Sequence, residues 1–197
     1  MNLISKAFVA YSMDILKDKS MLSSRHNVQH GDISVFTHSI MVAKYCYLLN
    51  RRYKLGCNPK TLIRGALLHD FFLYDWHDIP ADVAREGLHG FMHPMIAARN
   101  ARRQFEITPK EYSVIVTHMW PLTFTRVPFN REGWLVCMVD KYCSLLETLK
   151  VQPYSDREVS EWVRGVIKWE KTARGRGKVF NTNSQSKYRQ NLLSIGN

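Results

Sequence analysis

Apolar residues recur with a helical period along most of the chain. Residues 38–53 (HSIMVAKYCYLLNRRY) are apolar on every turn, and two arginines lie near the end of the segment, where a helix dipole favours positive charge. Residues 61–73 (TLIRGALLHDFFL) are apolar almost throughout, as in a buried helix. Between them, Gly56 offers a helix stop and Asn58-Pro59 a helix start. The pattern predicts two consecutive helices at the centre of the fold.

Four more segments carry the same period, and three of them also have clear boundary signals. Residues 93–105 open on His-Pro, which places Pro94 at the first helical position. Residues 108–119 and 155–171 each open on a capping box, TPKE and SDRE. Residues 131–150 (REGWLVCMVDKYCSLLETLK) form a long amphipathic pattern. Each segment is therefore predicted to be a helix.

Polar and proline-containing stretches separate these helices. Residues 74–87 are expected to form a loop with a short turn of helix at 80–86, and residues 121–130 a second loop. The mildly apolar residues 1–11 are interpreted as the first helix. Because β-branched residues are scattered through helical patterns, no set of strands is expected. The chain is predicted to be all-α, a single bundle of about seven helices over residues 1–171.

Positive charge is concentrated at the C-terminal end. The 197 residues carry a formal charge of +11, and residues 171–197 hold six lysines or arginines and no acid. We expect a basic, partly flexible tail at 172–197, within which 184–190 (SQSKYRQ) has no apolar face to bury. The modestly basic body suits a small anionic substrate, whereas the tail either contacts nucleic acid or is a solvated end.

Composition narrows the class of protein. Hydrophobic residues make up 45% of the chain, as in globular domains. No uncharged apolar run reaches about 18 residues, so neither a membrane span nor a membrane partner is expected. The four cysteines form no C-x-x-C pair, and we interpret them as small buried side chains in a reducing cytoplasm.

A histidine–aspartate pair interrupts the most hydrophobic segment. His69 and Asp70 lie within GALLHDFFL, and an ionised carboxylate buried alone is strongly unfavourable. A metal ion satisfies a neutral imidazole and a carboxylate at once. His38 and Asp140 interrupt two other apolar helices, each as a satisfied core group or as a ligand. Three helices that each deliver such a residue to one bundle favour a shared metal site.

These residues and their surroundings resemble the HD superfamily of metal-dependent phosphohydrolases. His38 stands in a His-Ser-x-x-Val-Ala setting, residues 66–70 read ALLHD, and residues 138–141 read MVDK, similar to the A-D-K segment of that family. The resemblance covers about residues 30–150. It implies an HD-type domain over 1–171 that hydrolyses a phosphoester or phosphoanhydride with a metal-activated hydroxide.

Two further histidines resemble those of superfamily branches with two metals. His93 begins an H-P-x-x-A-A motif, and His118 stands in VIVTHMW. The resulting H-HD-H-H-D order is similar to cyclic-dinucleotide phosphodiesterases of the HD-GYP branch and to bacterial symmetrical dinucleoside tetraphosphatases. Residues 120–122 read Trp-Pro-Leu where that branch has Gly-Tyr-Pro. This departure argues against cyclic di-GMP as the substrate.

The resemblance implies one or two divalent or transition metal ions as cofactor. In a two-metal site Asp70 is the natural bridge. The other ligands then divide into one set of His38, His69 and Asp140 and a second set of His93 and His118. Histidine with carboxylate suits Fe, Mn, Zn, Co or Ni, and resemblance to the two-metal branches favours iron or manganese.

Three residues are candidates for contact with a small phosphorylated substrate, which we expect to be a nucleotide or dinucleotide. Lys141 either joins Asp70 in catalysis by neutralising phosphoryl charge or is a helix-surface lysine. Arg64 either binds a phosphate or pairs with an acid. His77, in the loop after the doublet, either contacts the substrate or is simply exposed.

Two other functions compete with a hydrolase. A few two-metal relatives use a di-iron centre for oxygenation, which oxygen uptake would reveal. A non-catalytic module would sense a nucleotide, or bind nucleic acid through the tail with a salt-dependent affinity that is lost when residues 172–197 are deleted. The complete ligand set favours the hydrolase, because a pure binding module has no need of two buried metals.

Overall fold

The computed structural model of the protein describes residues 6–81 and 87–173. Within these residues the chain forms eight α-helices, one 3-10 helix and a two-stranded sheet. The α-helices are α1 (Lys6–Leu16), α2 (Lys19–Ser23), α3 (Val35–Tyr53), α4 (Pro59–Leu68), α6 (His89–Gln104), α7 (Pro109–Thr117), α8 (Arg131–Thr148) and α9 (Asp156–Ala173). The short elements are η1 (Ser24–His26), β1 (Val28–His30) and β2 (Ile33–Ser34). The predicted all-α fold is confirmed.

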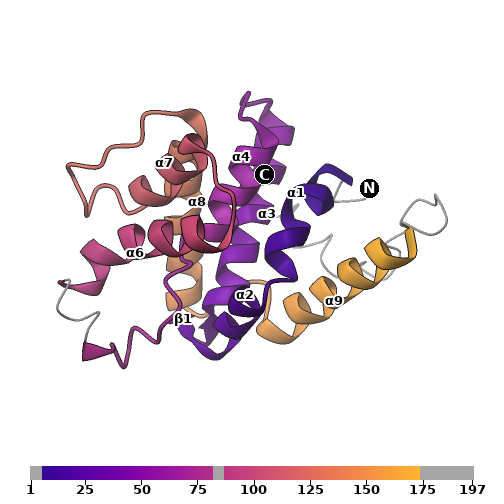
Figure 1. Cartoon of the computed structure of the whole chain (residues 1–197), viewed down its shortest axis with the longest axis horizontal. Helices are drawn as coiled ribbons and strands as arrows, with labels where there is room; N and C mark the ends of the chain where they lie inside the picture. Colours follow the sequence, from indigo (N-terminus) through magenta and orange to yellow (C-terminus); the bar gives the residue numbers. More distant parts are fainter. Residues whose placement is uncertain (1–5, 82–86, 174–197) are drawn as a thin grey trace.

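Helices α3 and α4 form the centre of the molecule (Figure 1). They pack against each other, α4 also contacts α1 and α7, and α3 also contacts α8 and α9. In Figure 1, α1 and α9 lie on one side of this pair, and α6, α7 and α8 on the other. Every residue of α4 from 61 to 68 is buried, which explains the nearly continuous apolar run in its sequence.

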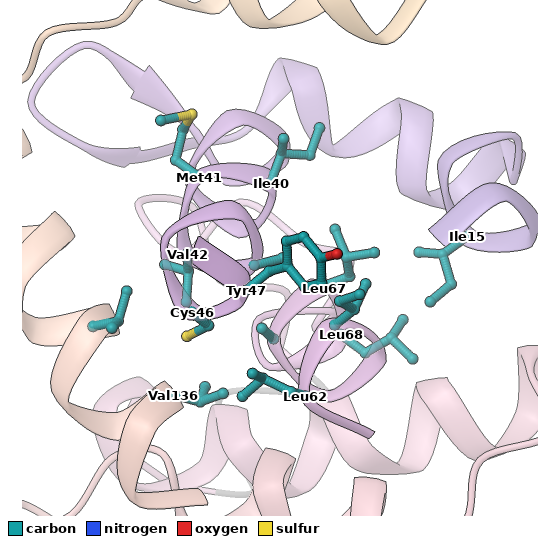
Figure 2. Packing of buried hydrophobic residues seen from close by; sticks show 14 of the residues in the cluster. Ile15, Ile40, Met41, Val42, Cys46, Tyr47, Leu62, Leu67, Leu68 and Val136 are labelled. Carbon is teal, nitrogen blue, oxygen red and sulfur yellow. The ribbon is translucent and has the colours of Figure 1, made fainter. Parts of the chain in front are cut away.

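The main hydrophobic core lies where these helices meet. Figure 2 shows part of it: Ile40, Met41, Val42, Cys46 and Tyr47 of α3, Leu62, Leu67 and Leu68 of α4, Ile15 of α1 and Val136 of α8. A smaller cluster of Val35, Phe72, Tyr74 and Ile96 packs the chain after α4 against α6. Burial of each large apolar side chain contributes about 1.5–3 kcal/mol to the stability of the fold. Both clusters therefore hold the segments that pack in them in place.

Side-chain caps begin three helices where the sequence predicts them. Asn58 accepts the N–H of Thr61 at the start of α4. Thr108 and Glu111 form a complete capping box at the start of α7. Ser155 accepts the N–H three residues further on, at the start of α9. Local sequence therefore sets these boundaries.

Helix α6 begins four residues before the predicted start. Its first residue is His89, and Pro94 lies inside the helix, so the expectation that Pro94 occupies the first helical position is wrong. Because Pro94 has no N–H, the helix lacks the hydrogen bond that this position would otherwise make to the carbonyl oxygen of Gly90. The earlier start places His89 and His93 one turn apart on the same face.

Helix α4 ends earlier than the predicted 61–73 segment. It ends at Leu68, and His69 and Asp70 follow in a turn. Leu73 has a left-handed φ of 65°, which no α-helix continues through. Asn100 of α6 holds this turn by donating to the carbonyl oxygens of residues 71 and 72. The doublet therefore lies at a helix end and not within a helix.

A β-hairpin precedes α3, where the sequence predicts no strand. Strands β1 and β2 are antiparallel, with His30 opposite Ile33. Strands of two and three residues are too short for a period of two to be detected. The turn between them contains Gly31 at a φ of 61°, and a Cβ there would collide with the carbonyl oxygen of Glu147. The hairpin therefore lies directly against the end of α8.

Some predicted features fall outside the described residues. The turn of helix at 80–86 and the tail at 172–197 lie largely beyond them. The first helix, expected within 1–11, is described from residue 6 and continues to Leu16. Among the described residues, no helix combines the length and the apolar character that crossing a membrane requires.

Candidate metal centre

Six buried side chains from α3, α6, α8 and the ends of α4 and α7 converge inside the bundle. They form two groups, one of His38, His69, Asp70 and Asp140, and one of Asp70, His93 and His118. Within each group the candidate ligand atoms all lie within 4.8 Å of one another. The structure thus brings together every residue that the sequence marks as a metal ligand, and Asp70 belongs to both groups.

His69 and His118 occupy equivalent positions at the ends of two helices. Each is the C-cap of its helix, α4 or α7. The last carbonyls of an α-helix have no partner within the helix. Nδ1 of His69 donates to the carbonyl oxygen of Ala66, and Nδ1 of His118 to that of Ile115, both at 2.7 Å. Because a carbonyl only accepts, Nδ1 carries the proton in the neutral form of each ring, and the lone pair of that form is on Nε2.

His38 lies in the first turn of α3, with both ring nitrogens facing carboxylates. Its Nδ1 is 2.7 Å from Oε2 of Glu147. Its Nε2 is 3.1 Å from Oδ1 of Asp140 and 3.8 Å from Oδ2 of Asp70. Asp140 comes from the middle of α8, where it interrupts an apolar run. The ring is therefore held from behind and presents Nε2 to the group.

Asp70 lies between the two groups. Its Oδ2 is 3.2 Å from Nε2 of His69, while its Oδ1 is 3.3 Å from Nε2 of His93 and 3.4 Å from Nε2 of His118. Gln29 of β1 donates its amide to Oδ2 at 2.6 Å. One carboxylate oxygen thus faces each group, as a bridging carboxylate requires.

Two facing nitrogens show that the second group suits a cation. Nε2 of His93 and Nε2 of His118 are 3.0 Å apart. Both Nδ1 atoms contact backbone carbonyls, that of His93 at 3.0 Å from the oxygen of His89. Two neutral rings so arranged point their lone pairs at each other, which is unfavourable without a positive charge between them. Ligand atoms bound at right angles to one ion at about 2.1 Å lie about 3 Å apart, so the pair fits a shared metal ion.

Buried atoms without hydrogen-bond partners also indicate that the cluster suits a cation. Nε2 of His69 and Oδ1 of Asp70 are both buried and lack a hydrogen bond. Leaving such an atom unsatisfied costs about 1–3 kcal/mol. A cation in each group would satisfy one of the two atoms. The residues present therefore fit one metal ion in each group.

The pKa values show how strongly these charges interact. Burial alone would lower the pKa of His69, but Asp70 and Asp140 outweigh it and raise the pKa to about 9. Burial also opposes protonation of His38, yet Glu147 and Asp140 raise its pKa well above the usual range. Burial would raise the pKa of Asp70, whereas its histidine neighbours, His69 first, hold it well below normal. Without a metal ion, protons on histidine balance the carboxylates, and a metal would displace them.

Lys141 adjoins this cluster. Its ammonium group donates to the carbonyl oxygen of His118 at 2.8 Å and lies 3.7 Å from Oδ2 of Asp140. The side chain is 38% exposed. Lys141 therefore lies at the edge of the cluster, between a metal-facing carboxylate and solvent.

The other two predicted substrate contacts lie outside the cluster. Arg64 is buried, with Nη1 2.5 Å from Oδ2 of Asp14 and Nε 3.2 Å from Oε1 of Glu111. His77 is exposed, and its Nδ1 lies 3.0 Å from Oδ1 of Asp75. The structure thus brings Lys141 to the candidate metal ligands, but brings neither of these two there.

Sequence reasoning does not identify several residues that support the cluster. Gln29 binds Asp70, Glu147 binds His38, and the hydroxyl of Tyr154 donates to Oε1 of Glu147 at 2.7 Å. One available signal is spacing, because Glu147 follows Asp140 by seven residues and so shares its face of α8. Gln29 and Tyr154 lie outside the helices and depend wholly on tertiary packing.

An aromatic stack lies behind His93. The ring of His89 stacks on that of His93 at a centroid distance of 4.6 Å and an interplanar angle of 16°, and Trp76 stacks on His89 at 5.5 Å and 19°. The hydroxyl of Tyr74 is 2.8 Å from Nδ1 of His89. Burial and the neighbouring His93 lower the pKa of His89 to about 4, so this support is neutral at physiological pH.

Fold and site together define an all-helical protein with adjoining histidine–aspartate groups that share one carboxylate, the pattern of a metal centre built inside a helical bundle. The sequence model of the HD domain matches residues 35–190, which is well over half of the chain. The chain therefore belongs to the HD domain family, most of whose members are metal-dependent hydrolases. No curated protein and no solved structure matches it.

Proposed function

We propose that this protein is a metal-dependent phosphohydrolase that cleaves a phosphoester or phosphoanhydride bond of a nucleotide or dinucleotide. The observation that carries the proposal is the position of Asp70, whose two oxygens face two separate sets of buried ligands. A shared carboxylate of this kind is typical of enzymes that hold two metal ions side by side for phosphoryl chemistry. Membership of the HD domain family supports the same class.

The chain supplies an enclosed set of ligands in fixed orientations. His38, His69 and Asp140 would hold one ion, His93 and His118 a second, and Asp70 both. Such ions supply an activated water nucleophile and neutralise charge on the phosphoryl oxygens. Because all six side chains are buried, the charges of the cluster act in a medium that weakens them less than water does. The donor set suits iron, manganese, zinc, cobalt or nickel, and the resemblance to the two-metal branches favours iron or manganese.

Lys141 is the residue we assign to the phosphoryl charge. It alone among the three predicted substrate contacts has its charged group against the cluster. His77 is exposed and available to a part of the substrate that extends beyond the metals. Arg64 is committed to two acids, which argues against direct contact with a phosphate.

Metal content tests the proposal directly. We would purify the full chain without added metal or chelator and measure transition metals per chain by plasma mass spectrometry, beside His93→Ala and His118→Ala. Near two ions per chain, falling toward one in either variant, is the expected result. His26→Ala is the matched control, because His26 is exposed and outside both groups, and its metal content should equal that of the wild type.

The metal that is found would then be used to screen nucleotides and dinucleotides for phosphate or nucleotide release, with Asp70→Asn as the inactive reference. A single ion per chain, unaffected by the two variants, would restrict the site to the group of His38, His69, Asp70 and Asp140. Absence of metal even after reconstitution with iron, manganese, zinc, cobalt or nickel would rule out the hydrolase.

A further inference from the structure

We infer that the two halves of the cluster bind metal unequally, and that Glu147 is the positioning residue that makes the half containing His38 the tighter one. The half containing His93 and His118 would then be the position from which an ion exchanges. The inference rests on the proposed function, since it takes both halves to be metal sites. It goes further by ranking them and by assigning the cause to a residue that is not itself a ligand.

The ligand sets already differ in charge. The tighter half has two carboxylates, Asp70 and Asp140, whereas the exchangeable half has only the share of Asp70 that its Oδ1 provides. Each half also contributes two histidines. A divalent cation is therefore attracted more strongly to the half with the second carboxylate.

Glu147 adds a third carboxylate behind the tighter half. Its side chain is fully buried, and each of its oxygens has one partner: Oε2 faces Nδ1 of His38 and Oε1 accepts the hydroxyl of Tyr154, both at 2.7 Å. Burial, and the neighbours Cys143 and Glu147, raise the pKa of Tyr154, so its hydroxyl keeps its proton and donates. The carboxylate is thus locked toward His38. A carboxylate behind a histidine ligand fixes the ring and increases its basicity toward metal.

In the other half, backbone carbonyl oxygens stand where a carboxylate stands behind His38. Nδ1 of His118 contacts the carbonyl oxygen of Ile115, and Nδ1 of His93 that of His89. The rings of His89 and Trp76 stack behind His93, so the groups described there are aromatic rings and not carboxylates. Carbonyls and aromatic rings orient a ligand but add no negative charge to it. The two halves therefore differ both in their ligands and in what stands behind them.

A metal titration of the full chain tests this ranking. Free Mn²⁺ would be followed by electron paramagnetic resonance as it is added to protein stripped of metal. We expect a tight phase and a weaker phase of one ion each in the wild type, and only the tight phase in His93→Ala. Glu147→Gln keeps an oxygen that can accept the His38 N–H but removes the charge. It should weaken the tight phase roughly 10- to 100-fold and leave the weak phase in place.

Two variants control for the general effect of changing a buried residue. Glu132 is a buried carboxylate on the same helix, where it accepts the N–H of Asn58 at 2.6 Å and pairs with Lys110, and Glu132→Gln should leave both phases unchanged. Tyr154→Phe removes only the hydrogen bond that locks Glu147, and should weaken the tight phase less than Glu147→Gln does. Circular dichroism of each variant checks that the helices are intact.

The outcomes separate this inference from the proposed function. If the wild type bound two ions with equal affinity, in a single phase, the ranking would be overturned, but the two-metal hydrolase would remain intact. The role of Glu147 would be overturned if Glu147→Gln and Tyr154→Phe both left the tight phase unchanged. It would also be overturned if they weakened both phases alike. Failure of the protein to bind any of manganese, iron, zinc, cobalt or nickel would overturn the proposed function, and this inference with it.

Discussion

The second nitrogen of each histidine in the cluster, Nδ1, determines which nitrogen the ring presents to its neighbours there. In His69, His93 and His118, Nδ1 donates to a backbone carbonyl, and in His38 it faces Glu147. All four rings therefore present Nε2, although they come from four different helical segments. The contacts behind the ligands, and not the ligands alone, turn scattered histidines into one set.

Metal affinity should rise with pH because metal and protons compete for the same histidines. The pKa of His69 is raised to about 9, above its unfolded value near 6.5, so the proton it binds stabilises metal-free protein below pH 6.5, and that contribution is lost as the pH rises through 9. Metal must displace this proton. We expect the apparent affinity to increase between pH 6.5 and 9, by roughly tenfold per pH unit for each proton released.

Competition with a chromogenic chelator at several pH values measures this, and proton release into a weakly buffered indicator counts the protons. Asp70 and Asp140 add nothing in this range, because their pKa values lie well below normal and both remain ionised. His26→Ala should show the same profile as the wild type. A flat profile from pH 6.5 to 9 would mean that metal binding does not displace a proton from His69.

At the scale of elements, a glycine sets how closely two ligand-bearing helices approach. A Cβ on Gly65 of α4 would lie 2.7 Å from Cγ1 of Val114 on α7. His69 and His118 follow this contact by four residues in their respective helices, one turn further on. The spacing of the two rings, whose centroids are 4.9 Å apart, therefore depends on the close crossing at Gly65.

Gly65→Ala should destabilise the protein and weaken its metal binding together. Val114 is stiff because it is β-branched, so the helices themselves must separate to admit the methyl group. Overpacking outweighs the better helix propensity of alanine, and we expect a net loss of about 1–2 kcal/mol in the free energy of unfolding. Urea unfolding and the Mn²⁺ titration measure the two effects.

Gly165→Ala on α9 is the matched control. A Cβ at Gly165 meets nothing within 4 Å, so only the propensity gain of about 0.5–1 kcal/mol remains and the protein should become slightly more stable. If Gly65→Ala behaved like Gly165→Ala, the crossing would not determine the geometry of the site.

At the scale of the whole molecule, a bound metal would cross-link the bundle. The ligands extend along the chain from His38 to Asp140 and come from α3, α4, α6, α7 and α8 or their ends. The unfolded chain cannot keep them together, so metal binds almost only to the folded state. The buried carboxylates and histidines, costly by themselves, then support the fold.

Adding metal should therefore raise the melting temperature of the stripped protein. At a free metal concentration 100 times the dissociation constant, binding at one site stabilises by about 2.7 kcal/mol, which corresponds to a shift of about 5–10 °C for a chain of this size. Scanning calorimetry with and without Mn²⁺ measures the shift. Asp70→Asn should abolish most of it, and an unchanged melting temperature in the wild type would argue against a buried metal centre.

Features that depend on neighbouring residues could be predicted from the sequence, and features that depend on distant residues could not. His38, His69 and Asp140 interrupt apolar patterns and were visible for that reason, and the structure places all three in one cluster. The predicted start of α6 was wrong because a proline usually indicates the first turn of a helix, whereas Pro94 lies in the second turn of α6. The hairpin that carries Gln29 was missed because its strands are shorter than any detectable period.

The sequence by itself determined the all-α fold, three helix caps and the candidate ligands His38, His69, Asp70 and Asp140, whereas His93 and His118 followed from the resemblance to the two-metal branches. The features in the first group need no such resemblance. These depend on periodicity, on capping and on the cost of burying charge, all of which act within a few residues. Only the tertiary structure decided that Asp70 lies between two groups, and that Glu147 and Tyr154 stand behind His38. Such pairings join segments up to 109 residues apart, and they arise from how helices pack and not from any local pattern.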